Sequence, residues 1–158
     1  MSELIRYCKK WFIMKKIAID PLSEAQALEM HVSGGSYTAL FEGGDYPACF
    51  IECLLDKKMI GVGFLDVRGR EYLTYQFRIL SGTQLFLSMA TYREFDRESD
   101  RVLSGDSYIF KEKGELYIRH SHMSPHALEE AQSTFDPAGN YEAFPAFGDY
   151  SSLTKVER

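Results

Sequence analysis

The chain has 158 residues, 45% of them hydrophobic and 26% charged, which is typical of one folded globular domain over residues 1–158 and argues against a disordered chain. Residues 1–16 carry five lysines and arginines against one glutamate, so they contribute +4 to the formal net charge of -5 and leave -9 for the remainder. An acidic body repels phosphate backbones, which disfavours nucleic-acid binding and favours a basic macromolecular partner.

The N-terminal segment contains only a short apolar run at residues 11–14, well below the roughly 7–15 apolar residues of a signal peptide. No other segment approaches the ~20 apolar residues of a membrane-spanning helix. Met14, which two lysines follow, is an alternative start of the chain. The three cysteines form no CxxC pattern, which fits a reducing compartment, and Cys49 and Cys53 are expected to be small core residues. We therefore expect a cytoplasmic protein that does not bind membranes.

A capping box formed by Ser23 and Gln26 predicts a short helix over residues 24–31. Beyond it, the dominant pattern is that of strands. Between residues 72 and 79 apolar and polar side chains alternate, and this period of two indicates a half-buried strand. The linking segments are too short for parallel crossovers, so the strands are expected to be antiparallel. The expected strands lie at residues 37–42, 48–55, 59–67, 72–79, 84–95, 107–111 and 115–121.

A second short helix is predicted over residues 125–133, because Ser124 is a suitable N-cap and Pro125 suits the first helical position. A lone helix of this length is marginal in water, so both helices are expected to pack on the sheet. The expected fold class is therefore α+β. It consists mainly of a curved antiparallel β-sheet of about six or seven strands with two short flanking helices.

Two histidines provide the main candidate for metal chemistry. His120 and His122 are two residues apart, so on a strand both imidazoles point to the same side, and His126, Glu129 and Glu130 follow nearby. The cysteine ligands of common structural zinc sites and the HExxH pattern are both missing. We therefore interpret this segment as a solvated strand end, and expect neither a metal nor another cofactor.

No motif in the sequence indicates catalysis. The patterns GxSxG, GxGxxG and GxxxxGK[ST] are absent, and no histidine lies in a local pattern that commits it to a nucleophile. The sequence therefore predicts a protein that is not an enzyme. Two alternatives stay open: a structural subunit with a constitutive partner, and a small-molecule-binding β-barrel or enzyme whose cavity would be lined by Tyr75, Phe77, Phe86 and Tyr117.

The C-terminal segment combines carboxylates with aromatic rings. Residues 124–154 contain five acidic residues, five aromatic residues and no lysine or arginine. Aromatic anchors are enriched in protein interfaces, and surrounding acids steer a basic partner towards them. The alternative is that the rings seal the core while the acids face water. The candidate partner-binding residues are Asp136, Tyr141, Glu142, Phe147, Asp149 and Tyr150.

The last 18 residues also carry a family resemblance. Residues 141–150, YEAFPAFGDY, followed by residues 151–158, resemble the end of small bacterial immunity proteins that accompany contact-dependent growth inhibition and related polymorphic toxins. The resemblance implies a cytoplasmic, non-catalytic inhibitor that binds one cognate toxin domain tightly. Toxins that attack nucleic acids tend to be basic, so an acidic inhibitor is consistent with the charge of this chain.

Overall fold

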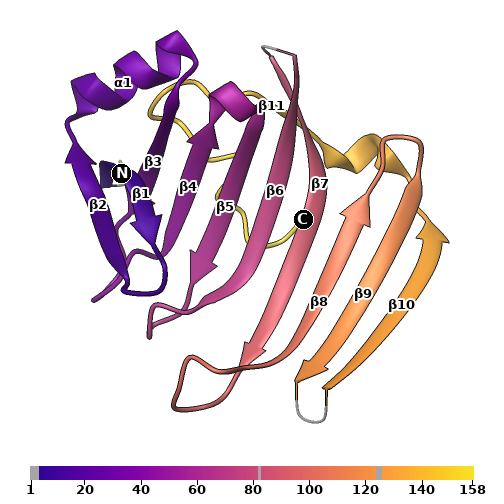
Figure 1. The fold of residues 1–158 in the computed structure, drawn as a ribbon. Helices are drawn as coiled ribbons and strands as arrows, with labels where there is room; N and C mark the ends of the chain where they lie inside the picture. Colours follow the sequence, from indigo (N-terminus) through magenta and orange to yellow (C-terminus); the bar gives the residue numbers. More distant parts are fainter. Residues whose placement is uncertain (1–3, 82, 124–125) are drawn as a thin grey trace.

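The computed structural model describes residues 4–81, 83–123 and 126–158. These residues form one large antiparallel sheet, with a helix at one end and an irregular C-terminal segment behind it (Figure 1). The elements in chain order are β1 (Ile5–Phe12), β2 (Ile17–Leu22), α1 (Glu24–Ser33), β3 (Ser36–Phe41), β4 (Cys49–Leu54), a 3-10 turn (Leu55–Lys57), β5 (Met59–Leu65), β6 (Glu71–Ser81), β7 (Gln84–Phe95), β8 (Val102–Phe110), β9 (Glu115–Met123), β10 (His126–Thr134), a second 3-10 turn (Pro137–Asn140) and β11 (Tyr141–Ala143).

The sheet is mostly a meander in which each strand pairs with the next along the chain. Its order is β10-β9-β8-β7-β6-β5-β4-β3-β1-β2, so β1 lies inside the sheet between β2 and β3. The short β11 pairs with β7 outside this path. The prediction of a mainly antiparallel sheet is confirmed, but the expected six or seven strands are too few, since the described residues form eleven.

The N-terminal segment supplies two of the strands that the sequence analysis missed. Within β1, Cys8 and Trp11 are buried, and they pack with Leu40, Phe50 and Leu65 in a small cluster separate from the main core. The exposed lysines of β1 do not alternate regularly with its buried residues, so the segment lacks the period of two that indicates a strand. A chain that began at Met14 would lack β1 altogether, and β3 would lose one of its two neighbours.

The expected helix over residues 24–31 is confirmed as α1. The Ser23 side chain accepts a hydrogen bond from the Gln26 backbone N–H, and the Gln26 side chain accepts one from the Ser23 N–H. Gly34 ends the helix with a φ of 77°, a left-handed conformation that favours glycine. Ala27 is the buried residue through which α1 meets the core.

The second predicted helix, over residues 125–133, is wrong. Residues 126–134 form strand β10, which pairs with β9 over nine consecutive residues without a bulge. The proposed cap, Ser124 with Pro125, lies outside the described residues. The hairpin with β9 satisfies the backbone of this segment through inter-strand hydrogen bonds, and this pairing outweighs a local helix preference.

The main core lies between the sheet and the C-terminal segment, which runs behind β3 to β7 (Figure 1). The largest fully buried side chains belong to the sheet and to two residues of that segment, Tyr150 and Leu153. Cys8, Cys49 and Cys53 are all buried and form no disulfide, as expected for core residues. Burial raises the pKa of the Cys53 thiol to about 12, so this cysteine stays protonated and inert.

Among the described residues, no helix has the length and apolar character required to cross a membrane.

Candidate functional site

The aromatic residues of the C-terminal segment lie largely in the core. Tyr150 is 2% exposed, and its hydroxyl shares a hydrogen bond of 2.9 Å with the Tyr37 hydroxyl, which lies 2.8 Å from Nδ1 of His31. The Phe147 ring stacks on Tyr7 with the ring centroids 5.1 Å apart. These contacts fasten the segment to β1, β3 and α1, which is the arrangement expected of a core-sealing tail.

Burial also sets the protonation of this network. Desolvation raises the pKa of both Tyr37 and Tyr150, and it lowers the pKa of His31 below its ordinary value of 6.5. All three groups are therefore neutral at pH 7. A neutral, hydrogen-bonded network of this kind stabilises the packing of Tyr150 against β3 and α1.

Two further candidate residues of this segment contact the chain itself. The Tyr141 ring packs edge-on against Phe86 at 5.1 Å, and its hydroxyl donates a hydrogen bond of 3.3 Å to Glu112. Glu142 forms an ion pair of 3.0 Å with Arg158. Both residues are only partly exposed, so their contribution to any partner is limited by these internal contacts.

The other two candidate carboxylates face water. Asp136 accepts a hydrogen bond of 3.0 Å from the Ala138 backbone N–H, which caps the second 3-10 turn. Asp149 accepts one of 2.9 Å from the Ser151 hydroxyl. Both side chains are exposed and could contribute charge to a surface, although each also stabilises a local turn. That the six candidate residues bind a partner stays a prediction.

A different surface emerges over strands β8, β9 and β10, most of which lies beyond the irregular residues 135–158, although Phe110 of β8 packs against Phe135 with the ring centroids 5.1 Å apart. None of the described residues in these three strands is buried, although the neighbouring strands β6 and β7 carry much of the core. Antiparallel sheets commonly leave one face in water, but here both faces are accessible. We refer to β8–β10 as the outer strands.

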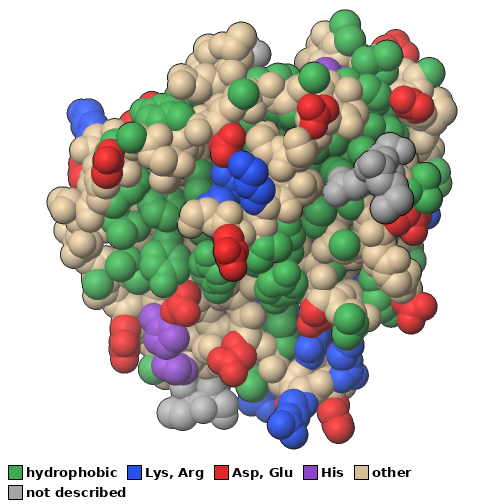
Figure 2. Space-filling model, turned by 180° about the vertical axis from the view of Figure 1, so that it is seen from behind, with side chains coloured by type: hydrophobic (Ala, Val, Ile, Leu, Met, Phe, Trp, Pro, Cys, Tyr) green, Lys and Arg blue, Asp and Glu red, His purple; other side chains and the backbone are tan. Residues whose placement is uncertain are grey.

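Cross-strand pairing shows that one face of the outer strands continues the core. Tyr75 pairs with Ala90, which pairs with Tyr108, then Ile118 and then Ala131, so these five residues form one row across the sheet. Exposure increases along the row, from the buried Tyr75 to the exposed Ala131. We call this side of β7–β10 the outer face, and Figure 2 shows hydrophobic side chains gathered over it. Its apolar residues are Tyr92, Tyr108, Phe110, Leu116, Ile118, Ala127 and Ala131.

The charges on the outer face have one sign. Tyr92 pairs with Asp106, which pairs with His120 and then Glu129, and Glu94 lies on the same side two residues after Tyr92. By strand alternation, no lysine or arginine of β7–β10 points to this face. The arginines of these strands, such as Arg93 and Arg119, lie on the opposite face. The outer face is therefore apolar with an acidic border.

The histidine pair lies at this acidic border, where His120 pairs with Asp106. Nδ1 of His120 forms a short contact with the Asp106 carboxylate, and Nε2 of His120 lies 2.8 Å from Nε2 of His122. His126 pairs with Met123 and points to the other face of the sheet. Across the described part of the chain, no three His, Cys, Asp or Glu side chains are grouped to hold a metal ion.

The four side chains proposed to line a small-molecule cavity are not all brought together, although Tyr75 and Phe77 share the main core. Tyr75, Phe77 and Phe86 are buried in tightly packed surroundings, at 1% exposure or less. Tyr117 lies on the opposite face of β9 from Ile118, in a shallow depression between β8 and β10. These four residues therefore define no common cavity.

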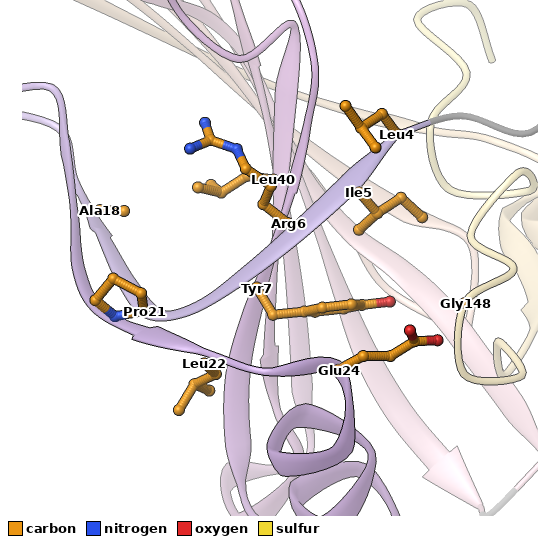
Figure 3. A pocket seen from close by; sticks show the side chains of 10 residues that line it. All are labelled: Leu4, Ile5, Arg6, Tyr7, Ala18, Pro21, Leu22, Glu24, Leu40 and Gly148. Carbon is orange, nitrogen blue, oxygen red and sulfur yellow. The ribbon is translucent and has the colours of Figure 1, made fainter.

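A hollow of about 580 Å³ lies instead near the far edge of the sheet, between β1, β2 and Gly148 (Figure 3). Figure 3 shows the Tyr7 ring beside it, with its hydroxyl on the same side as the Glu24 carboxylate. Arg6, the other charged group there, forms an ion pair of 3.1 Å with Glu42. Among the described residues that line the hollow, Arg6, Tyr7 and Glu24 are the titratable ones.

No family model matches this chain, and neither a curated protein nor a solved structure matches it. The candidate site therefore depends on the geometry alone. The outer face escaped the sequence analysis because its residues come from four strands. Pairing register, which sequence alternation does not supply, places them side by side.

Proposed function

We propose that the chain is a non-catalytic binding module of the immunity type, which neutralises a basic toxin domain by covering it with the outer face. One observation carries the proposal. The row of apolar side chains that begins in the core extends onto β8–β10, where these side chains are accessible and lie beside carboxylates. Contiguous exposed apolar surface with a polar border is a common mark of a protein interaction site.

The aromatic residues would supply the binding energy. Tyr92 is 43% exposed and packs edge-on against Tyr108, with ring centroids 6.0 Å apart. Tyrosine loses little conformational entropy on binding and presents a large apolar area, so such pairs are frequent interaction hot spots. Tyr108 also contacts the main core, which holds the ring in place before a partner arrives.

The carboxylates would select the partner. Glu94, Asp106 and Glu129 border the apolar residues, and no lysine or arginine among the described residues of β7–β10 points to this side, so a basic surface is attracted and an acidic one repelled. The exposed Asp136 and Asp149 of the C-terminal segment would extend this field. In this proposal, the aromatic rings of the C-terminal segment support the sheet rather than contact the toxin.

The experiment compares two tyrosines on opposite faces of the outer strands. Tyr108→Ala and Tyr117→Ala remove the same side chain, from the outer face and from the opposite face respectively. The probe is the purified product of the reading frame adjacent to the gene, tested for toxicity and for binding by biolayer interferometry. Tyr108→Ala should weaken binding by roughly 30-fold, about 2 kcal/mol, whereas Tyr117→Ala should change it less than about threefold.

The melting temperature of each variant separates loss of binding from loss of folding. Equal effects of the two variants on binding would contradict the assignment to the outer face. An adjacent product that is neither toxic nor bound by this chain would overturn the immunity-type function.

A further inference from the structure

We propose that the basic partner also adds a strand to the sheet at the free edge of β10, an inference that rests on the proposed function and specifies how the partner docks. The two ends of the sheet are built differently. The β2 edge is six residues long, contains Pro21, and is distorted at Asp20, which has a φ of 51°. Proline and local distortion are devices by which natural sheets block further pairing.

The β10 edge has none of these devices among its described residues. It is a regular strand of nine residues, all exposed, without proline and without a bulge in its pairing with β9. It also contains no lysine, the residue that most often protects an exposed edge. A long, regular and accessible edge of this kind is a template for an incoming strand.

The hydrogen-bond ladder between β9 and β10 identifies which backbone groups of β10 point away from the sheet. The Phe135 N–H donates to the Gly114 carbonyl at 3.0 Å, directly beyond the end of the β9–β10 ladder. Because antiparallel partners alternate between hydrogen-bonded and open pairs, odd-numbered residues of β10 direct their backbone groups towards β9. The backbone N–H and C=O groups of Leu128, Glu130 and Gln132 therefore point away from the sheet and are available to a further strand.

The charges on β10 favour a basic strand over a second copy of this chain. If two copies paired antiparallel along all nine residues, the centre of symmetry would place Glu130 opposite Glu130, and like charges in directly opposed positions are destabilising. Glu130 is partly neutralised by Arg119 on the opposite face, at 3.6 Å. Glu129, on the outer face, has no lysine or arginine beside it on β9 or β8.

The side chains on the outer face of β10 also define what the added strand should carry. Glu129 lies between Ala127 and Ala131, which are two residues away on either side and leave space above the sheet. A partner strand would fit with a basic residue opposite Glu129 and larger apolar residues opposite the two alanines. The sequence pattern expected in the partner strand is apolar-x-basic-x-apolar. This pattern reads the same in both directions, so it fits a parallel or an antiparallel strand.

The test uses a proline substitution at an outward-facing position. Gln132→Pro removes a free N–H without breaking the ladder with β9, and Gln132→Ala is the matched control that removes only the side chain. The first probe is an acetylated and amidated nine-residue peptide with a central lysine flanked by valines at the two apolar positions. The second probe is the same peptide with glutamate in place of lysine.

For the lysine peptide, we expect Gln132→Pro to weaken binding at least about tenfold and Gln132→Ala to change it less than about twofold. The glutamate peptide should bind at least about tenfold more weakly to the parent protein. Equal affinity of the two glutamine variants, or no saturable binding of the lysine peptide up to about 1 mM, would overturn strand addition.

Amide hydrogen exchange provides a second measurement that needs no variant. In the parent protein, the amides of Leu128, Glu130 and Gln132 should exchange fast and become protected when the peptide binds, whereas those of Glu129 and Ala131 are already protected. Protection that does not follow this alternation contradicts the proposal. With the adjacent-gene product as ligand, an effect of Tyr108→Ala without an effect of Gln132→Pro would refute strand addition alone, whereas no effect of either refutes both proposals.

Discussion

Tyr150 provides the sharpest test of whether the C-terminal segment belongs to the core. Its ring is almost fully buried and packs edge-on against Phe41, and its hydroxyl bonds to Tyr37. Tyr150→Phe removes the hydroxyl and its neutral hydrogen bond to Tyr37, while Tyr37 keeps its bond to His31, so we expect a loss of about 1 kcal/mol or more in the free energy of unfolding. Tyr150→Ala also removes the ring, and large-to-small changes of aromatic core residues cost about 3–5 kcal/mol.

These energies translate into clear differences in melting temperature. For a chain of this length, 1 kcal/mol corresponds to a shift of roughly 2–4 °C, so Tyr150→Phe should melt about 2–4 °C lower and Tyr150→Ala roughly 6–20 °C lower. Circular dichroism and differential scanning calorimetry on the isolated protein measure both shifts. No partner is needed, because the effect arises within the free chain.

An interface residue would behave differently. If Tyr150 served chiefly to bind a partner, its removal would leave the free protein as stable as the parent and would speed dissociation of the complex instead. A shift smaller than about 2 °C for Tyr150→Ala would therefore refute the sealing function and restore the segment as a binding surface.

Three further predictions concern other parts of the chain. Burial beside Glu71 raises the pKa of the Glu52 carboxyl above its ordinary value of 4.5. Because the fold favours the protonated form, the free energy of unfolding falls as the pH rises from 4.5 through the folded-state pKa. Glu52→Gln should therefore raise the melting temperature at pH 7 but not below pH 4.5, and an equal gain at both pH values would contradict this. A chain beginning at Met14 lacks β1 and should show no cooperative thermal transition, and a normal transition would show that β1 is dispensable. Chelator should leave the melting temperature unchanged both in the parent and in the double variant His120→Ala/His122→Ala, whereas a drop confined to the parent would indicate a bound metal.

The features that the sequence alone determined depend on near neighbours in the chain. The alternation at residues 72–79 reappears in β6, where Leu73, Tyr75 and Phe77 are buried on one side. The capping box at Ser23 forms as predicted, because both of its hydrogen bonds join residues three positions apart. Cys49 and Cys53 are buried, as predicted for small core residues.

Residues 126–134 show what the sequence could not decide. This segment combines good helix formers with a plausible cap, yet it becomes a strand because β9 offers nine consecutive backbone partners. Its conformation is set by pairing with another strand rather than by its own preferences. The same holds for β1, whose position inside the sheet depends on hydrogen bonds to β2 and β3.

The candidate site was decided by tertiary structure almost entirely. The sequence indicated that His120 and His122 share a side, but the contact of His120 with Asp106 depends on the register between β8 and β9. The rings and acids of residues 136–150 are adjacent in sequence, yet folding places Tyr150 in the core and leaves Asp149 in water. Residues far apart in the chain became the outer face because strand pairing brings them into one row, and because the buried residues Tyr150 and Leu153 pack on the other half of the sheet.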